Sequence, residues 1–477
     1  MQLKAEKEIP LESKSRLGWD RAWNSWLALV LLGLALSSVV QGYYRQAFLT
    51  ATPTGVPVDF PHYYMAGRLA RLRPPENTLY FPPADHRPTS YTELRTDATT
   101  PYGRSSGVGG LPDGAVTMPF DAPPFSALLM ASVASLRWDQ AYFVWQVLSA
   151  LMIGVAVYFA VGLAQGGPPS ILVAALTLVI AFNFMPVNRA ISLGNIDPVI
   201  LLLWVLGVFL LQRRRVAPSA FCFALGTAIK LSPIYAVPLF ALRRQWRWLA
   251  WYLIWTVILL VASVWKVGWQ NHVLWATQVA PALSCGIRGF WSRSLPGLVF
   301  ALSNPQRLMI CLPGDHALCL VNKVLSGIVY GAFLFWCWRT SRDSRALVFE
   351  VTLLPLVVLL VSPMSWTQYY VLAVLPLIYL WMRSREFHAG SSHRGLILLA
   401  GCALLFGSAV PDHFAQVLGP AAELWLIGGW VAGTLTAIGV GMRMGKSWAA
   451  EEHISTGSNS QREVSRVASL SPATTGN

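Results

Sequence analysis

The sequence predicts an all-α, polytopic membrane protein, and two features of its composition support this prediction. Of its 477 residues, 55% are hydrophobic and only 12% are charged, which is about half the charged fraction of an ordinary soluble protein. The chain also contains 21 Trp, 37 Gly and 31 Pro residues, which membrane proteins use in interfacial aromatic belts and interrupted helices. This composition excludes a soluble globular enzyme.

Ten apolar runs are long enough to cross the roughly 30 Å hydrocarbon core of a bilayer. They cover residues 24–41, 140–164, 169–187, 198–212, 248–267, 320–338, 346–362, 367–382, 395–410 and 423–442. Two shorter or interrupted candidates lie at 119–136 and 217–241. We therefore expect about 10–13 transmembrane helices. The first run is expected to be a retained helix, because no small-residue cleavage site follows it.

Basic residues gather in short loops between these runs and set the predicted orientation. The clusters are Arg213, Arg214 and Arg215; Arg243, Arg244 and Arg247; Arg339, Arg342 and Arg345; Arg383 and Arg385; and Arg443 and Lys446. Short basic loops remain in the cytoplasm, so the net charge of +14 indicates membrane orientation and no nucleic-acid partner. The same count places two long loops, about 42–118 and 269–318, on the extracytoplasmic side.

Two stretches do not fit a simple alternation of crossings. The apolar runs between 119 and 212 return Arg213 to the wrong side, so one of them is expected to be re-entrant, and the Pro-rich run 119–136 is the first suspect. Segment 217–241 begins and ends at cytoplasmic arginines. It is therefore either a pair of short helices that meet at 230–233 or a wrong assignment.

The domain organisation follows from these runs. Residues 1–446 are predicted to form one integral-membrane domain. Residues 447–477 are rich in Ser, Thr, Glu and Asn and lack an apolar period, so they are expected to be a disordered cytoplasmic tail.

The first external loop contains a segment, 58–70, with helical periodicity. Its apolar residues recur on the side opposite Arg68 and Arg71, which predicts a juxtamembrane amphipathic helix in the membrane interface. Asp59 stands at the start of this helix. Spacing alone favours an N-cap whose carboxylate accepts N–H groups of the first turn. A catalytic carboxylate is the alternative, and the two roles are compatible because a cap is held rigidly.

Five short motifs follow one another along residues 24–385. They are Asp-Phe-x-x-Tyr-Tyr-x-Ala from Asp59 with Leu-Tyr at 79–80, Pro-Pro-Phe-x-x-Leu-Leu at 123–129, Leu-Gly-Asn-Ile-Asp at 193–197, Gly-Thr-Ala-Ile-Lys-Leu-Ser-Pro at 226–233, and Ser-Pro-Met-Ser-Trp at 362–366. Together these motifs resemble glycosyltransferase family 87. Two departures stand out: Gln368 replaces a His that the family often has, and the loop 82–118 is longer than usual.

This resemblance implies a GT-C-type helical bundle in the inner (plasma) membrane, with its active site on the extracytoplasmic face. The family consists of polyprenyl-phosphate-sugar-dependent mannosyltransferases of the bacterial cell envelope. The chain is accordingly expected to transfer a sugar, mannose by this resemblance, from a polyprenyl-phosphate donor to a lipid or glycan acceptor, with inversion. No cofactor is implied. No carboxylate pair stands at metal-ligand spacing, so no metal is expected.

Inverting transfer from a lipid phosphosugar needs a carboxylate beside the attacking hydroxyl and cations beside the leaving phosphate. Asp59 fits the first role, as general base. Lys230 fits the second, because a lone ammonium in an apolar stretch is costly, and a snorkelling lysine is the equal alternative. Arg288 and Arg293 are external and suited to a bidentate phosphate clamp, with solvated loop arginines as the favoured alternative.

Other polar residues near the motifs are candidates for contact with the donor sugar or phosphate. They are His62, Tyr63, Tyr64, Asn195, Asp197, Trp366 and Gln368. Interface anchoring alone explains Tyr and Trp at such positions, and a helix cap is the favoured alternative for Asp197. Asp121 is a further, weaker candidate for the same cavity.

A transporter or flippase for a lipid-linked saccharide is the alternative function. A transferase is expected to gather Asp59, Lys230 and the arginines of 286–293 in one cavity open to the outer leaflet and the bilayer, whereas a transporter needs polar groups near the midplane and a path to both sides. In the second loop, Cys311 and Cys319 flank a Pro-Gly turn, which leaves open either a local disulfide or two unpaired thiols.

Overall fold

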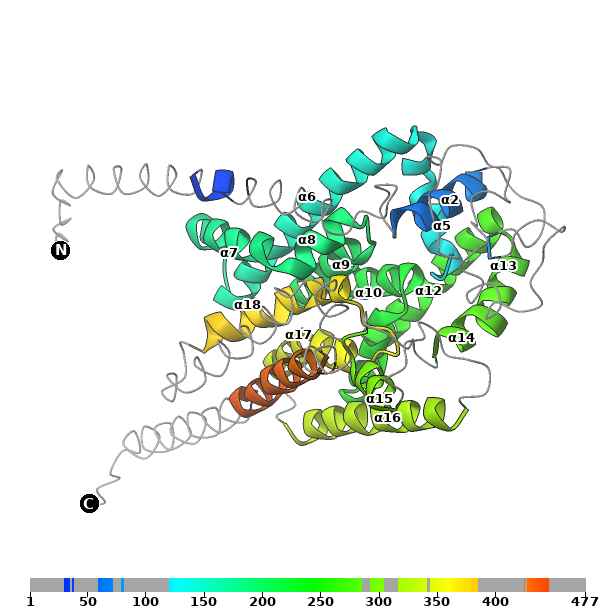
Figure 1. The fold of residues 1–477 in the computed structure, drawn as a ribbon. Helices are drawn as coiled ribbons and strands as arrows, with labels where there is room; N and C mark the ends of the chain where they lie inside the picture. The colour runs from blue at the N-terminus through cyan, green and yellow to red at the C-terminus, as the bar shows by residue number, and fades with distance from the viewer. Residues whose placement is uncertain are drawn as a thin grey trace, which may run out of the picture.

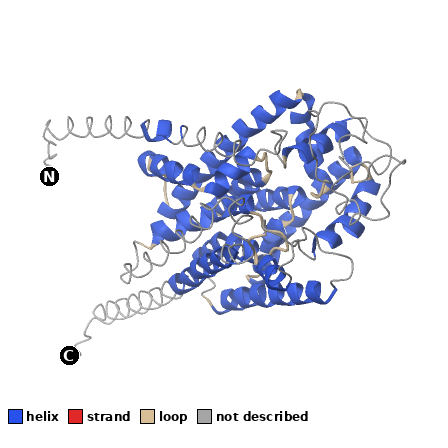
Figure 2. Ribbon diagram, in the orientation of Figure 1, coloured by secondary structure: helices blue, strands red, loops and turns tan. Residues whose placement is uncertain are grey.

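The computed structural model of the protein is a helical bundle, as Figure 1 and Figure 2 show. It describes residues 30–34, 37, 59–71, 79–80, 120–284, 292–303, 316–340, 344–384, 424 and 427–445. Within these residues no strand forms, and one isolated antiparallel β-bridge joins Ser292 to Trp366. The predicted all-α class is therefore confirmed.

Most of the described helices coincide with predicted apolar runs. The helices are α2 (Phe60–Arg71), α5 (Pro124–Ala131), η2 (Val133–Ser135), α6 (Trp138–Gln165), α7 (Ile171–Asn183), α8 (Met185–Ser192), α9 (Asp197–Gln212), α10 (Val216–Ile229), η3 (Ser232–Tyr235), α11 (Ala236–Leu242), α12 (Trp246–Val267), α13 (Trp269–Leu274), η4 (Trp275–Val279), α14 (Ala280–Ser284), α15 (Leu295–Ser303), α16 (His316–Arg339), α17 (Ser344–Val361), η5 (Thr367–Ala373) and α18 (Val374–Arg383). However, α13, η4, α14 and α15 lie in the segment 269–318 that was predicted to be an external loop. Residues 427–445 form a further helix, drawn in red beside α17 in Figure 1.

Three of the described helices, α6, α12 and α16, are long and apolar enough to cross a membrane. Their outward faces carry large exposed hydrophobic side chains such as Leu151, Trp265 and Ile328, a surface suited to lipid rather than to water. The α7–α8 pair raises the number of candidate spans to four if it is one bent span, and α9, α10 and η3–α11 are shorter apolar helices. The total of 10–13 spans stays a prediction, since the run 395–410 lies outside the described residues.

The suspected re-entrant run, 119–136, contains only α5 and η2. The eight residues of α5 rise about 12 Å, which is too short for a span. A second interruption, not predicted from the apolar pattern, lies between α7 and α8, which are bent by 70° where Phe184 takes an extended conformation. Pro186 follows in the first turn of α8, where its missing N–H costs no helical bond.

The segment 217–241 is a pair of short helices, as one of the two predictions for it required. α10 ends at Ile229, Lys230 is extended with φ −151° and ψ 133°, and η3 with α11 leads away again. Gly226 allows the close return, because a Cβ there would lie 2.9 Å from Cγ of Pro233. Lys230 therefore stands at the apex between two helical segments.

α9 packs in the centre of the bundle, against α6, α10 and α17. Trp204 on α9 donates to the carbonyl of Val351 on α17 at 3.1 Å, and Gly207 lets Phe223 of α10 approach so closely that a Cβ would lie 2.5 Å from its ring. No charged side chain follows Asp197 within α9. Its 16 residues separate the two ends of the bundle by about 24 Å.

Several of the predicted cytoplasmic arginines lie at the end of the bundle where α9 finishes and α10 begins. The guanidinium of Arg243 is buried and pairs with both carboxylate oxygens of Glu350 on α17, and it also donates to Thr340 at 2.7 Å. Arg243 therefore connects the end of α11 to α17 and to the end of α16, in addition to being part of a basic loop. α2, α5 and α13 gather at the other side of the bundle (Figure 1).

Cys319, near the start of α16, is disulfide-bonded. Its expected partner, Cys311, lies outside the described residues, so the pairing itself stays a prediction. The alternative of a free thiol at position 319 is wrong. Cys222 and Cys337 are free and buried.

Candidate active site

Asp59 lies immediately before α2 and is 1% exposed. α2 is amphipathic as predicted: Arg68 and Arg71 are its least buried side chains, and the other residues pack inward. Gly67 crosses α5 so closely that a Cβ would lie 2.7 Å from the carbonyl oxygen of Met130. The apolar face of α2 therefore packs against protein, which fixes the start of the helix.

A turn before α9 meets the start of α2. The N–H of Phe60 donates to the carbonyl of Leu193 at 2.9 Å, and the indole of Trp145 donates to the carbonyl of Gly194 at 3.0 Å. Gly194 has φ +68°, and a Cβ there would lie 2.5 Å from Cβ of Phe60. Only glycine satisfies both constraints, and the turn presents the next residue, Asn195, to Asp59.

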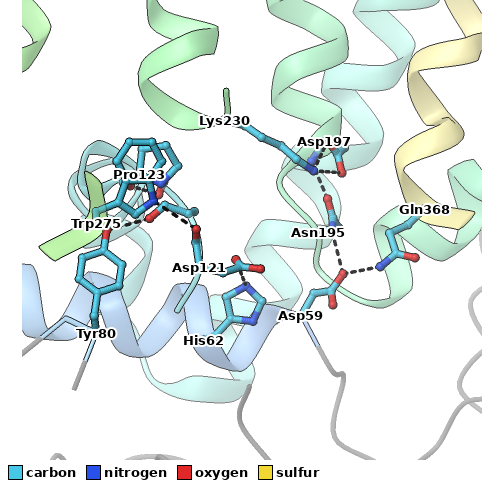
Figure 3. Close-up of polar contacts among 12 residues, drawn as sticks. Asp59, His62, Tyr80, Asp121, Pro123, Asn195, Asp197, Lys230, Trp275 and Gln368 are labelled. Atoms are coloured by element: carbon cyan, nitrogen blue, oxygen red, sulfur yellow. Dashed lines mark hydrogen bonds and ion pairs between the residues drawn. The ribbon is translucent and has the colours of Figure 1, made fainter. Parts of the chain in front are cut away.

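The two oxygens of the Asp59 carboxylate have different surroundings (Figure 3). Oδ2 accepts hydrogen bonds from Nδ2 of Asn195 at 2.7 Å and from Nε2 of Gln368 at 2.9 Å. Oδ1 is buried and has no hydrogen-bond partner among the described residues. The carboxylate is thus held by two side-chain amides, and the N-cap interpretation is wrong because the first turn of α2 contributes no bond to it.

Burial raises the pKa of the Asp59 carboxyl above its ordinary value, because desolvation disfavours the charged form. The neighbouring His62 and the hydrogen bonds from Asn195 and Gln368 act in the opposite direction, and Asp121 adds to the rise. The group is therefore a stronger base than a solvated aspartate, which suits general-base chemistry.

Asp197 and Lys230 form a buried ion pair next to this carboxylate. Nζ of Lys230 lies 2.8 Å from each carboxylate oxygen of Asp197. The side chain of Asp197 is fully buried and that of Lys230 is 22% exposed. Asn195 links the pair to Asp59, because its Oδ1 accepts the N–H of Asp197 at 2.8 Å.

This geometry decides the roles that the sequence left open for Asp197 and Lys230. Asp197 is the first residue of α9, Ile196 is the N-cap, and the carboxylate faces Lys230, so the cap interpretation of Asp197 is wrong. Nζ of Lys230 lies 3.2 Å from the ring centroid of Tyr369 and is paired with Asp197. The ammonium is therefore held inside the protein and does not extend to the membrane surface as a snorkelling lysine would. Sequence analysis missed Tyr369, which had no signal beyond its place three residues after Trp366.

The corner at 362–368 brings Gln368 to the site and holds Arg293. The N–H of Arg293 donates to the carbonyl of Ser365 at 2.6 Å, and its Nε donates to Oγ1 of Thr367 at 3.4 Å. Arg293 is 2% exposed, so the interpretation as a solvated loop arginine is wrong for it. Trp366 stacks on Tyr369 with centroids 6.0 Å apart. Arg288 lies outside the described residues.

The remaining candidates divide into two groups. Nε2 of His62 lies 4.0 Å from Oδ1 of Asp121, and both residues lie beside Asp59 (Figure 3). The rings of His62 and Tyr63 are tilted by 46° with their centroids 4.1 Å apart. Tyr64 points elsewhere: its hydroxyl donates to the carbonyl of Leu136 at 2.9 Å, which is a packing role. In the part of the chain that the structure describes, no group of three or more His, Cys, Asp or Glu residues is placed to hold a metal ion.

Comparison with known proteins identifies the family. The sequence model of glycosyltransferase family 87 matches residues 121–363, which is half of the chain. The chain belongs to glycosyltransferase family 87. This member is therefore an enzyme, a membrane-bound hexosyltransferase, and the matched region includes Asn195, Asp197 and Lys230.

One relative within reach of sequence comparison is a polyprenol-phosphate-mannose-dependent alpha-(1-2)-phosphatidylinositol mannoside mannosyltransferase of Mycobacterium tuberculosis. It is 23% identical to this chain over 351 residues, covering 67% of this chain and 77% of the relative. Asp59 and Gln368 lie outside the family match, so their place in the site comes from the geometry.

Replacement of Gly194 by Ala is expected to damage the site of this family 87 enzyme. A Cβ at 194 adds left-handed strain of about 1–2 kcal/mol and pushes Phe60, and with it Asp59, away from Asn195. We expect Gly194→Ala to lower both the melting temperature in detergent and the transfer rate. Gly268→Ala is the matched control, since Gly268 also has positive φ, at +88°, but has nothing within 4 Å of its Cβ position. Equal transfer by the two variants would contradict the expectation.

Proposed function

We propose that this enzyme transfers mannose from a polyprenyl-phosphate donor to a lipid or glycan acceptor on the extracytoplasmic face of the plasma membrane. The reaction proceeds with inversion, and Asp59 is the general base. Support for the donor comes from the relative, whose name specifies polyprenol-phosphate-mannose. Support for the base comes from the buried Asp59 carboxylate at one end of the helical bundle, one oxygen of which has no hydrogen-bond partner in the part of the chain that the structure describes.

The observation that carries this proposal is the Asp59 carboxylate: its Oδ1 has no partner among the described residues, and its Oδ2 is linked through Asn195 to the ion pair of Asp197 with Lys230. The acceptor hydroxyl attacks the anomeric carbon from the face opposite the phosphate, and this single displacement inverts the configuration. Its proton passes to Asp59, the bond between the anomeric carbon and the phosphate oxygen breaks, and the electron pair leaves with polyprenyl phosphate. Proton transfer to a positioned base lowers the barrier because the attacking oxygen gains nucleophilicity as it reacts.

Lys230 is the cation proposed for the leaving phosphate. Asp197 holds its ammonium from the buried side, while the 22% exposure of the Lys230 side chain leaves an approach for an anionic ligand. A fixed cation stabilises the negative charge that builds on the phosphate during bond breaking. Arg293 is the second candidate, because it is held against the same corner as Gln368.

A transferase accounts for these positions better than a transporter or flippase does. The polar groups gather at one end of the bundle, and α9 and α10 contain no charged residue beyond Asp197. The helices that flank the site thus present no charged path toward the opposite side, which a transporter of a charged lipid needs.

The orientation of the site follows from the positions of the basic residues. α9 begins at Asp197 in the site and ends next to Arg213, and α10 runs back from Arg215 to Lys230. If the basic end is cytoplasmic, as basic short loops are, the site lies on the extracytoplasmic side.

A cysteine at position 139 is therefore expected to react with a membrane-impermeant thiol reagent in intact cells, and a cysteine at position 215 is not. Asp139 is 69% exposed near the start of α6, where Trp138 packs on Phe60 with ring centroids 5.2 Å apart. Arg215 is exposed at the opposite end. The unsubstituted protein corrects for native thiols, and labelling of both positions, or of 215 alone, would reject the orientation.

Transfer itself is tested with purified enzyme, radiolabelled polyprenyl-phosphate mannose and a lipid extract of the source cells. The expected result is a new labelled glycolipid or glycan that requires both the donor and the native enzyme. Parallel reactions with polyprenyl-phosphate glucose and with a nucleotide-linked mannose examine the donor. Label transferred only from one of these other donors would overturn the proposed donor.

A further inference from the structure

The asymmetry of the Asp59 carboxylate points to residues with a role that sequence and family do not assign. The two oxygens of a carboxylate are equivalent in water, and each accepts about two hydrogen bonds. Here both amide donors converge on Oδ2, and Oδ1 has no partner among the described residues although it is buried. A buried polar atom without a partner is costly and needs an explanation.

We propose that Asn195 and Gln368 are positioning residues that hold Oδ2 of Asp59 and so reserve Oδ1 as the atom that receives the proton of the acceptor hydroxyl. This inference rests on the proposed function, in which Asp59 is the general base. It specifies that Oδ1 is the reacting oxygen of Asp59 and that Asn195 and Gln368 are the side chains that leave it free to react.

Each amide is itself held in one orientation. Oδ1 of Asn195 accepts the backbone N–H of Asp197 at 2.8 Å, so its Nδ2 is directed at Asp59. Gln368 is 2% exposed and lies on η5, directly after the corner that is tied to the 292–293 segment. An ionised carboxylate only accepts hydrogen bonds, so the amide of Gln368 presents its NH₂ group. Two donors from different elements therefore resist rotation of the carboxylate.

The two amides also favour the reactive charge state. Hydrogen bonds to an ionised carboxylate are about twice as strong as neutral ones and stabilise the charged form. Amides do not ionise, so the donors remain in place over the whole range in which the carboxylate titrates. Four titratable groups interact electrostatically with Asp59. They are His62, Tyr63, Asp121 and Asp197.

In the reaction step, the O–H bond of the acceptor breaks and its proton passes to Oδ1. The acceptor oxygen forms the bond to the anomeric carbon, and the phosphate leaves with the electron pair of the broken bond. Oδ2 keeps both amide bonds throughout, so the carboxyl group does not have to reorient while the proton moves. Groups that are already held in the reactive geometry lower the activation barrier, because they do not have to reorganise during the reaction.

Gln368→Met tests the proposal, because it removes the donor and keeps a side chain of similar length. We expect kcat to fall about 10–100-fold with little change in the KM for donor. The acid limb of the pH profile of kcat is expected to move to higher pH, since loss of a hydrogen bond to the charged form raises the pKa of the base. Gln368→His, which retains an N–H donor, is expected to recover most of the lost kcat.

Gln368→Glu is a second test, because it has the same shape as the native side chain, and recovery of kcat by Gln368→His guards against a folding defect. The Gln368→Glu variant replaces the donor with a second carboxyl group, so kcat is expected to fall further as that group ionises and repels Asp59. Gln212→Met is the matched control: Gln212 also donates to protein, to the carbonyl of Leu163 at 3.4 Å, but at the opposite end of α9. It is expected to keep the native kcat and acid limb.

Asp59→Asn is assayed alongside these variants to separate the two proposals. Loss of transfer in Asp59→Asn together with native kcat and acid limb in both Gln368→Met and Gln368→Glu would overturn the positioning role and leave the base intact. Full transfer by Asp59→Asn would overturn the base itself. A fall in kcat and a shifted limb in the Gln368 variants, with Gln212→Met unchanged, would support the inference.

Discussion

Asp59→Asn protein is expected to fold, extract and bind donor as the native enzyme does, yet to lose about 10²-fold or more in turnover, the usual scale for general-base catalysis. Asparagine keeps the size of aspartate, and its carbonyl oxygen still accepts from one neighbouring amide. It has no oxygen basic enough to take the proton of a hydroxyl. The measurement is the rate of labelled mannose transfer at saturating donor, with the melting temperature in detergent as the check on folding.

Asp139→Asn is the matched control for this substitution. Asp139 lies near the same end of the bundle, and its contact with Arg137 is 3.7 Å long and largely exposed, so the variant is expected to retain native turnover. Near-normal transfer by well-folded Asp59→Asn would reject Asp59 as the base. Asp121, 4.0 Å from His62, would then be the next carboxylate to replace.

Lys230→Met is expected to have the second large effect, on both stability and transfer. Removal of the ammonium leaves the fully buried carboxylate of Asp197 without its partner, and breaking a buried ion pair in this way costs about 3–5 kcal/mol. The proposed phosphate contact is lost as well, so transfer is expected to be weak even at temperatures where the variant is folded. Melting temperature and donor KM are measured together.

The double variant Lys230→Met with Asp197→Leu separates these two effects. It removes both charges, and replacing a buried pair by apolar side chains is often close to neutral for stability. We expect the melting temperature to recover most of the loss while transfer stays low, because no cation faces the leaving phosphate. Recovery of transfer along with stability would mean that Lys230 has only a structural role.

Much of the fold follows from local pattern. Hydropathy predicted the bounds of α6, α12 and α16 to within four residues, because a helix in lipid must satisfy its own backbone hydrogen bonds over the whole span. Periodicity gave α2, and the Lys-Leu-Ser-Pro step at 230–233 gave the break between α10 and η3. These features depend on neighbours within a few turns of helix, which a sequence displays directly.

Sequence reasoning was weaker where a choice depended on distant partners. Asp59 and Asp197 both stand at helix starts, and local spacing favoured a cap at each. The structure instead gives Asp59 the amides of Asn195 and Gln368, which lie 136 and 309 residues away along the chain. Arg293 resembled a solvated loop residue, although it is buried against the 362–368 corner.

By itself, then, the sequence determined that this chain is a helical membrane protein, where most of its described helices lie, and which family its motifs resemble. Only the tertiary structure decided that the two amides take one oxygen of Asp59 and that Asp197 neutralises Lys230. The physical reason is that a buried polar group costs free energy unless it is hydrogen-bonded or paired, so its partners are the groups that the fold brings next to it in space. Gly194 makes this arrangement possible, because its left-handed conformation and missing Cβ let the turn before α9 contact the start of α2.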